Sequence, residues 1–327
     1  MIDPAERIPL GRTSATVSRL SLGTVPIGLL YEPVGRAQAL ATVRKAYELG
    51  VGMFDTAPLY GSGLSERRLG AALAGLPRER FTVATKVGYT IDPAYAEQEQ
   101  PTAPPPSPGY DFSYDGALRC VDGSLHRLGL DRLDLLHIHD PDDHMDEAVA
   151  GTYRALRRMR DEGAVAAIGA GMNHGHLLAQ LLERADLDCV LLAGRYTLLD
   201  QRALADLLPL AASRGVAVIV GGPFNSGILA TPHAEGAPFN YAPAAQEWLA
   251  KARAIDAVCL RHGVPIKAAA LQFPLGHPAV ATVLAGARSP EEVAENAAMQ
   301  GFPIPAALWD ELRAEGLIAP EAPAPPA

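Results

Sequence analysis

The amino-acid sequence predicts a single α/β domain folded as a (β/α)8 barrel, the TIM-barrel class, over residues 1–319. Eight short apolar runs alternate with segments of helical apolar spacing, which suits a closed barrel better than an open sheet. Several helical segments end at a glycine that an apolar run follows at once, the usual connection from a helix to a strand. Three runs end in different acid–base side chains, as expected where catalytic groups gather at one end of a barrel.

The eight expected strands are short and mostly apolar. In chain order they are Leu20–Gly23, Gly52–Asp55, Phe81–Lys86, Leu133–His137, Val165–Gly169, Cys189–Ala193, Val216–Val220 and Thr282–Ala285. Helical spacing predicts helices over Ala37–Leu49 and Asp146–Glu162. Ser289 before a proline and two glutamates is typical of a helix start, so we expect a further helix over Pro290–Gln300.

Two segments stand outside this alternation. Residues 87–114 follow the third strand, are rich in proline and would overhang the catalytic face. A long connection without secondary structure is usually functional or disordered, so this segment is expected to be a substrate lid or, alternatively, a mobile bystander. The Pro/Ala-rich tail, residues 320–327, is expected to be frayed.

Composition excludes several classes of function. The net charge of −9 and the pI near 5.5 offer no basic surface for nucleic acid. Three scattered cysteines without a C-x-x-C pair predict neither disulfides nor a cysteine-based zinc site. No apolar run reaches the ~18 residues that a membrane helix needs. The N-terminus lacks the pattern of a signal peptide, so a cytoplasmic protein without an implied protein partner is expected.

The acid–base residues cluster at three predicted strand ends. The segment Phe54–Gly61 delivers a carboxylate, Asp55, and a phenol, Tyr60, at the exit of one strand. The next strand ends in Lys86, and the run that begins at Leu133 reaches His139. Taken singly, the aspartate could cap a turn, the lysine could be its structural partner and the tyrosine could be core. Four such groups at matching strand ends favour an active site.

These residues resemble the aldo-keto reductase family. The resemblance rests on Phe54–Gly61, the Ala84-Thr85-Lys86 strand end, Leu128–Asp134 with His139, Ile168–Asn173 and Leu284–Ser289, in the order of the family. Gly171-Met172-Asn173 and Phe224–Leu229 are similar to the branch that holds L-fucose and D-threo-aldose 1-dehydrogenases and pyridoxal 4-dehydrogenase. The resemblance implies a catalytic tetrad of Asp55, Tyr60, Lys86 and His139.

The chemistry of the implied tetrad is coherent. A free tyrosine, with a pKa of about 10, holds its proton too tightly to act as a base near neutrality. A nearby ammonium on Lys86 is expected to lower that pKa, with Asp55 holding the lysine charged and oriented. His139 would polarise the substrate oxygen. Tyr60 would take the proton during oxidation and return it during reduction.

His137 and His139 also allow a metal hypothesis. The two side chains point to the same side of a strand, beside the acidic segment Asp140–His144. A barrel metal hydrolase would use such a set, but no other strand end offers a histidine. We therefore predict no metal and interpret His137 as an interior histidine.

The resemblance further implies a nicotinamide dinucleotide, NAD or NADP. No G-x-G-x-x-G motif follows a strand, so a Rossmann site is not supported. Asn173 is implied to hold the carboxamide, Phe224–Leu229 the pyrophosphate, and the start of the Pro290–Gln300 helix the adenosine phosphate. The residues that the resemblance implies to bind the cofactor are Gly23, Thr24, Asn173, Tyr196, Phe224, Asn225, Ser226, Gly227, Leu229, Gly286, Arg288, Glu295 and Asn296.

The local sequence departs from the commoner family pattern at two places. Ala193 stands where many members have glutamine, and Val220–Pro223 lacks the aromatic residue that stacks on nicotinamide. Phe224 or Tyr196 could compensate. Arg288 is the one clear cation in the sequence for a 2′-phosphate, and the neighbouring glutamates oppose the extra charge, which favours NAD.

The expected function is oxidation of an aldose at C1 to its lactone. Tyr31, Tyr89 and Trp248 are the candidate substrate residues, because apolar sugar faces pack well on aromatic rings. Pyridoxal oxidation and a generic aldehyde or ketone reductase are alternatives within the class. A nucleotide-binding regulatory subunit with little turnover is the alternative from another class.

Overall fold

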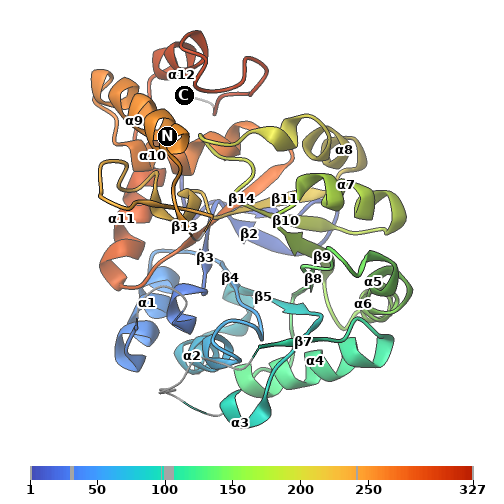
Figure 1. Ribbon diagram of the computed structural model, residues 1–327. Coiled ribbons are helices and arrows are strands. Elements are labelled where there is room, and N and C mark those ends of the chain that lie inside the picture. The colour runs from blue at the N-terminus through green and yellow to red at the C-terminus, as the bar shows by residue number, and fades with distance from the viewer. Residues whose placement is uncertain (1, 30–32, 97, 99–106, 241, 326–327) are drawn as a thin grey trace.

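The computed structural model describes residues 2–29, 33–96, 98, 107–240 and 242–325. Eight parallel strands form a closed barrel in the order β3-β4-β5-β8-β9-β10-β11-β14, with β14 paired to β3 (Figure 1). The strands are β3 Leu20–Gly23, β4 Met53–Asp55, β5 Thr82–Val87, β8 Leu135–His139, β9 Ala167–Met172, β10 Cys189–Ala193, β11 Ala217–Gly221 and β14 Val280–Gly286. The predicted fold class is confirmed, and each expected strand overlaps one of these.

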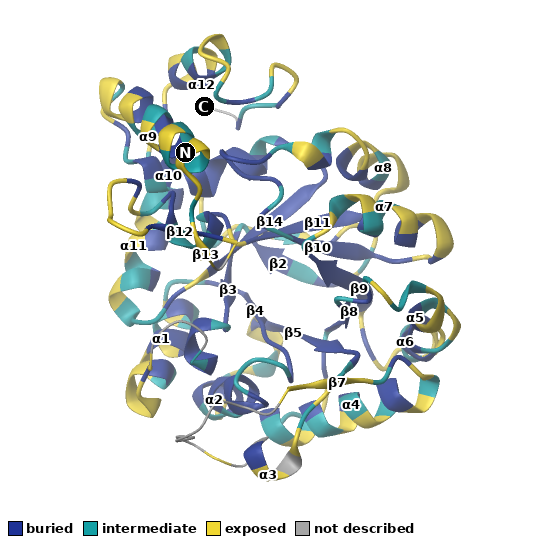
Figure 2. Cartoon of the chain, in the orientation of Figure 1, coloured by how far each residue is buried: buried dark blue, intermediate teal, exposed yellow. Residues whose placement is uncertain are grey.

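Helices surround the barrel, with their exposed residues turned outward and the strands buried (Figures 1 and 2). They are α1 Arg36–Glu48, α2 Leu64–Leu73, α4 Tyr114–Leu128, α5 Met145–Ala150, α6 Thr152–Asp161, α7 Gly175–Arg184, α8 Leu207–Arg214, α9 Gln246–Arg261, α10 Ile266–Gln272, α11 Pro290–Gln300 and α12 Ala306–Ala314. The α11 start is as expected, because the Ser289 side chain accepts a hydrogen bond from the Glu292 amide. Within the described ranges, no helix combines the length and apolarity that crossing a bilayer requires.

One helix prediction is wrong. The pattern over Asp146–Glu162 forms α5 and α6, separated at Gly151, whose φ of −111° and ψ of −80° are not helical. The chain before α4 docks at this point: Phe112 O accepts from both the backbone N and the Oγ1 of Thr152, at 2.9 and 2.8 Å. A side chain at position 151 would lie 2.3 Å from that same oxygen. Tertiary contact thus divides the helix.

A hairpin that the sequence reading missed closes the N-terminal end of the barrel. It pairs β1 Arg7–Pro9 with β2 Thr16–Ser18 and buries Leu10 and Val17 against the first residues of several barrel strands. Strands this short, one of them ending in proline, carry little periodic signal. The hairpin leaves the opposite end of the barrel open for the site.

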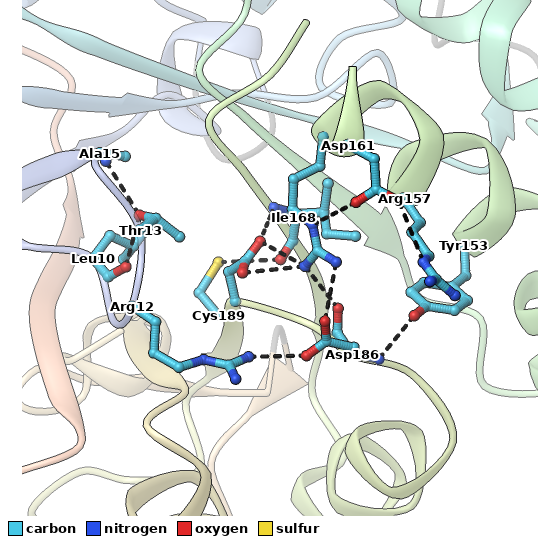
Figure 3. Close-up of polar contacts among 12 residues, drawn as sticks. Leu10, Arg12, Thr13, Ala15, Tyr153, Arg157, Asp161, Ile168, Asp186 and Cys189 are labelled. Atoms are coloured by element: carbon cyan, nitrogen blue, oxygen red, sulfur yellow. Dashed lines mark hydrogen bonds and ion pairs between the residues drawn. The ribbon is translucent and has the colours of Figure 1, made fainter. Parts of the chain in front are cut away.

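Ion pairs stabilise this same end from outside (Figure 3). Arg160 of α6 pairs with Asp186 and Asp188, which precede β10, and Arg12 of the hairpin turn reaches Asp186 at 2.9 Å. Asp188 Oδ2 also accepts from the Ile168 amide of β9 at 2.9 Å. The network joins helix, hairpin and two strands at the end away from the site, where barrels place stability rather than chemistry.

The segment after β5 is partly ordered. β6 Tyr89–Thr90 pairs with β7 Gly109–Tyr110, and a short helix α3 spans Pro93–Ala96. The residues between them, 97 and 99–106, lie outside the described residues. The two ends of the long connection are therefore held together above β5, and its role as a lid stays a proposal.

The tail differs from the expectation of fraying over the part that is described. Ala322 is 1% exposed, and its carbonyl accepts from Arg313 Nη2 at 3.0 Å. The chain passes so close to Gly276 that a Cβ there would lie 2.3 Å from Pro323 O. Packing against the barrel therefore orders residues 320–325, and residues 326–327 lie outside the described ranges.

Candidate active site

The four implied catalytic residues lie together at the open end of the barrel. Lys86 Nζ donates to Asp55 Oδ1 at 2.5 Å and to Thr56 O at 2.9 Å. The same nitrogen lies 4.7 Å from the centroid of the Tyr60 ring. The Tyr60 ring meets the His139 ring edge to face, with centroids 5.8 Å apart. Parallel pairing of β4, β5 and β8 brings these strand ends to one rim.

The turn after β4 positions the phenol. Gly61 has a φ of +61°, which a glycine adopts readily. A Cβ there would lie 2.5 Å from Gly28 O, so the turn packs closely on the loop after β3. This close approach holds Tyr60 over the barrel mouth.

The lysine–aspartate pair is almost fully removed from water, with exposed side-chain fractions of 1% and 2%. Burial by itself disfavours an ammonium, but the charges of Asp55 and Tyr60 and their hydrogen bonds outweigh burial and raise the pKa of Lys86. Lys86 therefore stays protonated, held by Asp55 and pointing its charge at the phenol.

The phenol departs from the expectation drawn from the sequence. Burial raises the pKa of Tyr60 to about 12, and the opposing effect of Lys86 is smaller. The lysine acts in the expected direction, but desolvation is the larger effect because the tyrosine is enclosed. Tyr60 is therefore a neutral proton donor across the neutral range, and it needs a further positive charge nearby to act as a base.

Both histidines of the H-x-H pair are neutral. Burial, and then the charge of Lys86, lowers the pKa of His139 well below its ordinary value and the pKa of His137 to about 3. Neither ring nitrogen of His137 has a hydrogen-bond partner among the residues that the structure describes. His137 lies inside the barrel beside Gly169, where a Cβ would be 2.7 Å from its Nδ1. In the described ranges, no group of three or more His, Cys, Asp or Glu could hold a metal.

His137 is expected to make the protein sensitive to acid. The pKa of His137 in the folded protein, about 3, is below the ordinary value of ~6.5. Its contribution to the free energy of unfolding is therefore fully present above pH 6.5 and is lost as the pH falls toward 3. Over that window, the free energy of unfolding should fall by about 1.4 kcal/mol per pH unit more in the wild type than in His137→Asn. Urea unfolding at several pH values measures both slopes, and equal slopes would contradict a buried neutral His137.

Two adjoining cavities form one cleft beside the tetrad. Both are lined by Pro26, Gly222, Ser226 and Gly286. The first extends to Asp55, Tyr60 and Asn173, and the second extends to Arg288, Glu295 and Asn296 at α11. The cleft thus runs from the catalytic groups to the α11 N-terminus.

Most of the residues predicted to bind the cofactor line this cleft. They are Gly23, Asn173, Phe224, Asn225, Ser226, Gly227, Gly286, Arg288, Glu295 and Asn296. Three others lie behind it. Thr24 Oγ1 donates to Asp55 O at 2.8 Å, Tyr196 is fully buried with its ring 5.3 Å from that of Phe273, and Leu229 is fully buried core. These three support the cleft wall, and Tyr196 does not take the place of a stacking aromatic.

The loop after β11 makes internal hydrogen bonds. The amides of Asn225, Gly227 and Leu229 donate to Gly222 O and Phe224 O at 3.0 to 3.1 Å. Asn225 and Ser226 have φ values of +47° and +63°, so the loop is tightly wound. A pyrophosphate would have to compete with these bonds for the three amides.

The sequence reading missed two cations that line the cleft. Arg195, two positions after β10, donates to Asn240 Oδ1 at 2.9 Å across the first cavity. Lys267 of α10 lines the second cavity and pairs with Glu295 at 2.8 Å. Arg288 is therefore not the one cation at the far end, as the sequence suggested. For Arg195, its position just after a strand was a signal in the sequence that it could lie at the cleft. Lys267 lies within a helix and carries no such signal.

The three substrate candidates have different positions. The Tyr89 ring lies 5.0 Å from that of His139, so it borders the reacting centre. Trp248 of α9 stacks on Phe239 at 4.5 Å and is not among the residues that line the cleft. Tyr31 lies outside the described residues.

Comparison with known proteins places the chain among oxidoreductases. A model of the Aldo/keto reductase family matches residues 19–315. A pyridoxal 4-dehydrogenase of Microbacterium luteolum is 42% identical over 96% of this chain and 98% of its own, and a D-threo-aldose 1-dehydrogenase of a Pseudomonas species is 37% identical over 92% and 95%. The solved aldo-keto reductase AKR11C1 from Bacillus halodurans superposes with a TM-score of 0.74 at 27% identity, covering 94% of this chain and 95% of that one.

Proposed function

The chain belongs to the aldo/keto reductase family, and from this premise we propose that it oxidises an aldose at C1 to the lactone with a nicotinamide cofactor. It is an oxidoreductase that acts on CH–OH or carbonyl groups. The observation that carries the proposal is the bonding of Lys86 to Asp55 directly beneath the Tyr60 ring. A protein that only binds nucleotides has no physical need for that buried pair.

The cleft fits a nicotinamide nucleotide. Asn225 lines it, and its Oδ1 is buried without a hydrogen-bond partner among the described residues, so this residue offers an acceptor suited to a carboxamide NH2. Asn173 would hold the same group from the other wall, and residues 224–227 would flank the pyrophosphate. When bound, the nicotinamide supplies the hydride acceptor and, in its oxidised form, a positive charge.

The chain's own groups then handle the proton. Tyr60 Oη exchanges a proton with the substrate oxygen, taking it in oxidation and returning it in reduction. Lys86 favours the phenolate and opposes the raised pKa that burial causes. His139, being neutral, hydrogen-bonds the substrate oxygen without adding charge. Lys86 and His139 are buried and Tyr60 is only partly exposed, which limits the access of water to the proton transfer.

The residues at the α11 end of the cleft favour NAD over NADP. Arg288 Nη2 pairs with Glu292 at 2.8 Å, and Lys267 pairs with Glu295 at 2.8 Å. Both cations are therefore already matched by carboxylates, which would repel a 2′-phosphate.

Glu292→Gln is expected to shift this preference. The change removes the carboxylate that pairs with Arg288 and keeps an oxygen that can accept from the Arg288 amide. NADP affinity should rise by about tenfold relative to NAD, since one negative charge leaves the site. Titration of both cofactors measures the ratio of the two affinities, with the exposed neighbour Glu291→Gln as the matched control.

Arg288→Ala should weaken the binding of NADP more than that of NAD. An equal loss of affinity for both cofactors would exclude contact between Arg288 and the 2′-phosphate.

Pyridoxal oxidation is the second candidate, because the relative that is 42% identical is named for it. Pyridoxal forms a cyclic hemiacetal, so the same groups would oxidise it to a lactone. A generic aldehyde or ketone reductase uses the same groups in reverse. The cytoplasmic location and the absence of a protein partner stay predictions.

A screen of nicotinamide absorbance tests the proposal. L-fucose, D-arabinose, L-galactose and pyridoxal are each assayed with NAD and with NADP. Turnover of an aldose with lactone formation is the expected result. Turnover of pyridoxal alone would favour the second candidate, and slow or absent turnover with all four, despite tight cofactor binding, would support a regulatory subunit instead.

A further inference from the structure

Asp140 directly follows His139 and is an unusual carboxylate. Its Oδ2 lies 3.6 Å from His139 Nε2 and 3.5 Å from the Tyr89 hydroxyl. Burial, and then the neighbouring Asp142, raises the pKa of Asp140 to about 6. Its side chain nevertheless remains 36% exposed, so it can be reached from outside. Among the residues that the structure describes, no lysine or arginine forms an ion pair with it.

The backbone holds this carboxylate at the rim. Asp140 has a φ of +43°, a left-handed conformation that is uncommon for a residue other than glycine. Its amide donates to Gly171 O at 3.0 Å, which fixes it to the end of β9. Lys86, Tyr89 and His174 only partly offset the burial of this carboxylate, and a strained backbone and a partly buried charge both cost stability. Such costs concentrate at functional sites.

The position of Asp140 relative to the reacting oxygen follows from these distances. A substrate oxygen at hydrogen-bond distance from His139 Nε2, about 3 Å, lies at most about 7 Å from Asp140 Oδ2. The Tyr89 ring, which is tilted against that of Tyr110 with the centroids 4.8 Å apart, adjoins His139 on one side. The substrate therefore meets a flat ring and a hydrogen-bond acceptor beside the carbon that reacts.

We infer that Asp140 sets the charge class of the substrate: it accepts hydrogen bonds from hydroxyl groups of a neutral polyhydroxy substrate and repels substrates that carry a carboxylate or phosphate. The inference rests on the proposed function, since it takes His139 as the group that meets the reacting oxygen. Within roughly 8 Å, the Debye length at physiological salt, a negative group carried elsewhere on the substrate is little screened from Asp140 across a partly enclosed site.

The test compares L-galactose with L-galacturonic acid, which differ by a carboxylate in place of the C6 hydroxymethyl group. The kcat/KM of each is measured at pH 8, where Asp140 is ionised, in wild type, Asp140→Asn and Asp143→Asn. Asparagine has the same shape and tolerates a positive φ. Asp143 is exposed on the same segment, so its variant makes the same change of net charge as a matched control.

In the wild type, kcat/KM should be higher for L-galactose than for L-galacturonic acid. Asp140→Asn should reduce the ratio of the two values by about tenfold, and Asp143→Asn should leave it unchanged. An equal loss of kcat/KM for both sugars in Asp140→Asn would overturn the inference, because it would show a general structural role. If no variant turns over either sugar, the proposed function fails. The binding of the same two sugars to the cofactor-loaded protein is then measured by calorimetry. If Asp140→Asn leaves the ratio of their two dissociation constants unchanged, the inference is overturned.

Discussion

Tyr60→Phe is expected to lower kcat by about 10²–10⁴-fold, the range that general acid–base catalysis contributes. The change removes the oxygen that we propose exchanges a proton with the substrate, and it leaves the ring against His139. Cofactor affinity should be almost unchanged, since the phenol lies at the catalytic end of the cleft. Steady-state kinetics and a fluorescence titration of the cofactor measure the two quantities.

A second tyrosine provides the control. Tyr47 of α1 is partly buried, and its hydroxyl has no hydrogen-bond partner among the described residues. Tyr47→Phe therefore removes the same atom away from the cleft and should leave kcat as in the wild type. Full activity in Tyr60→Phe would exclude the phenol as the proton donor.

Lys86→Met is expected to reduce turnover by a similar factor, through the loss of the ammonium that favours phenolate. It should also destabilise the fold by about 3–5 kcal/mol, because Asp55 is left buried without its partner. Activity must therefore be measured together with the free energy of unfolding.

The double variant Lys86→Met with Asp55→Asn separates the two effects. It removes both buried charges, so stability should recover much of the loss while turnover stays low. Recovery of activity along with stability would show that Lys86 acts only by holding the fold. Urea unfolding and steady-state kinetics on the same preparations decide between these outcomes.

The barrel was predictable because each strand is a local apolar pattern, and parallel barrels place strand ends on one rim. The same rule predicted that Asp55, Lys86 and His139 gather at one rim, and the family resemblance implied that they form a tetrad with Tyr60. The family resemblance implied by these motifs is confirmed by the match over residues 19–315.

Features that depend on contacts between distant segments could not be read from the sequence. The break at Gly151 arises from the backbone of Phe112, about 40 positions earlier, and no local pattern signals it. The raised pKa of Tyr60 reflects enclosure, which exceeds the effect of the neighbouring charge. Arg195 and Lys267 line the cleft through the spatial arrangement of strand ends and helices, whereas in the sequence they are ordinary cations.

The pairing of Gly23 with Gly286 joins the first strand of the ring to the last, and both residues also line the cleft. A chain still emerging from the ribosome without β14 lacks this seam, so it has neither a finished dinucleotide groove nor a covered edge on β3 and β11. A complete cleft therefore requires that synthesis of this polypeptide has passed Asn296, the last residue that lines it. Before β14 is made, the edges of β3 and β11 that it covers are open to pairing with other chains, which adds a risk of aggregation late in translation.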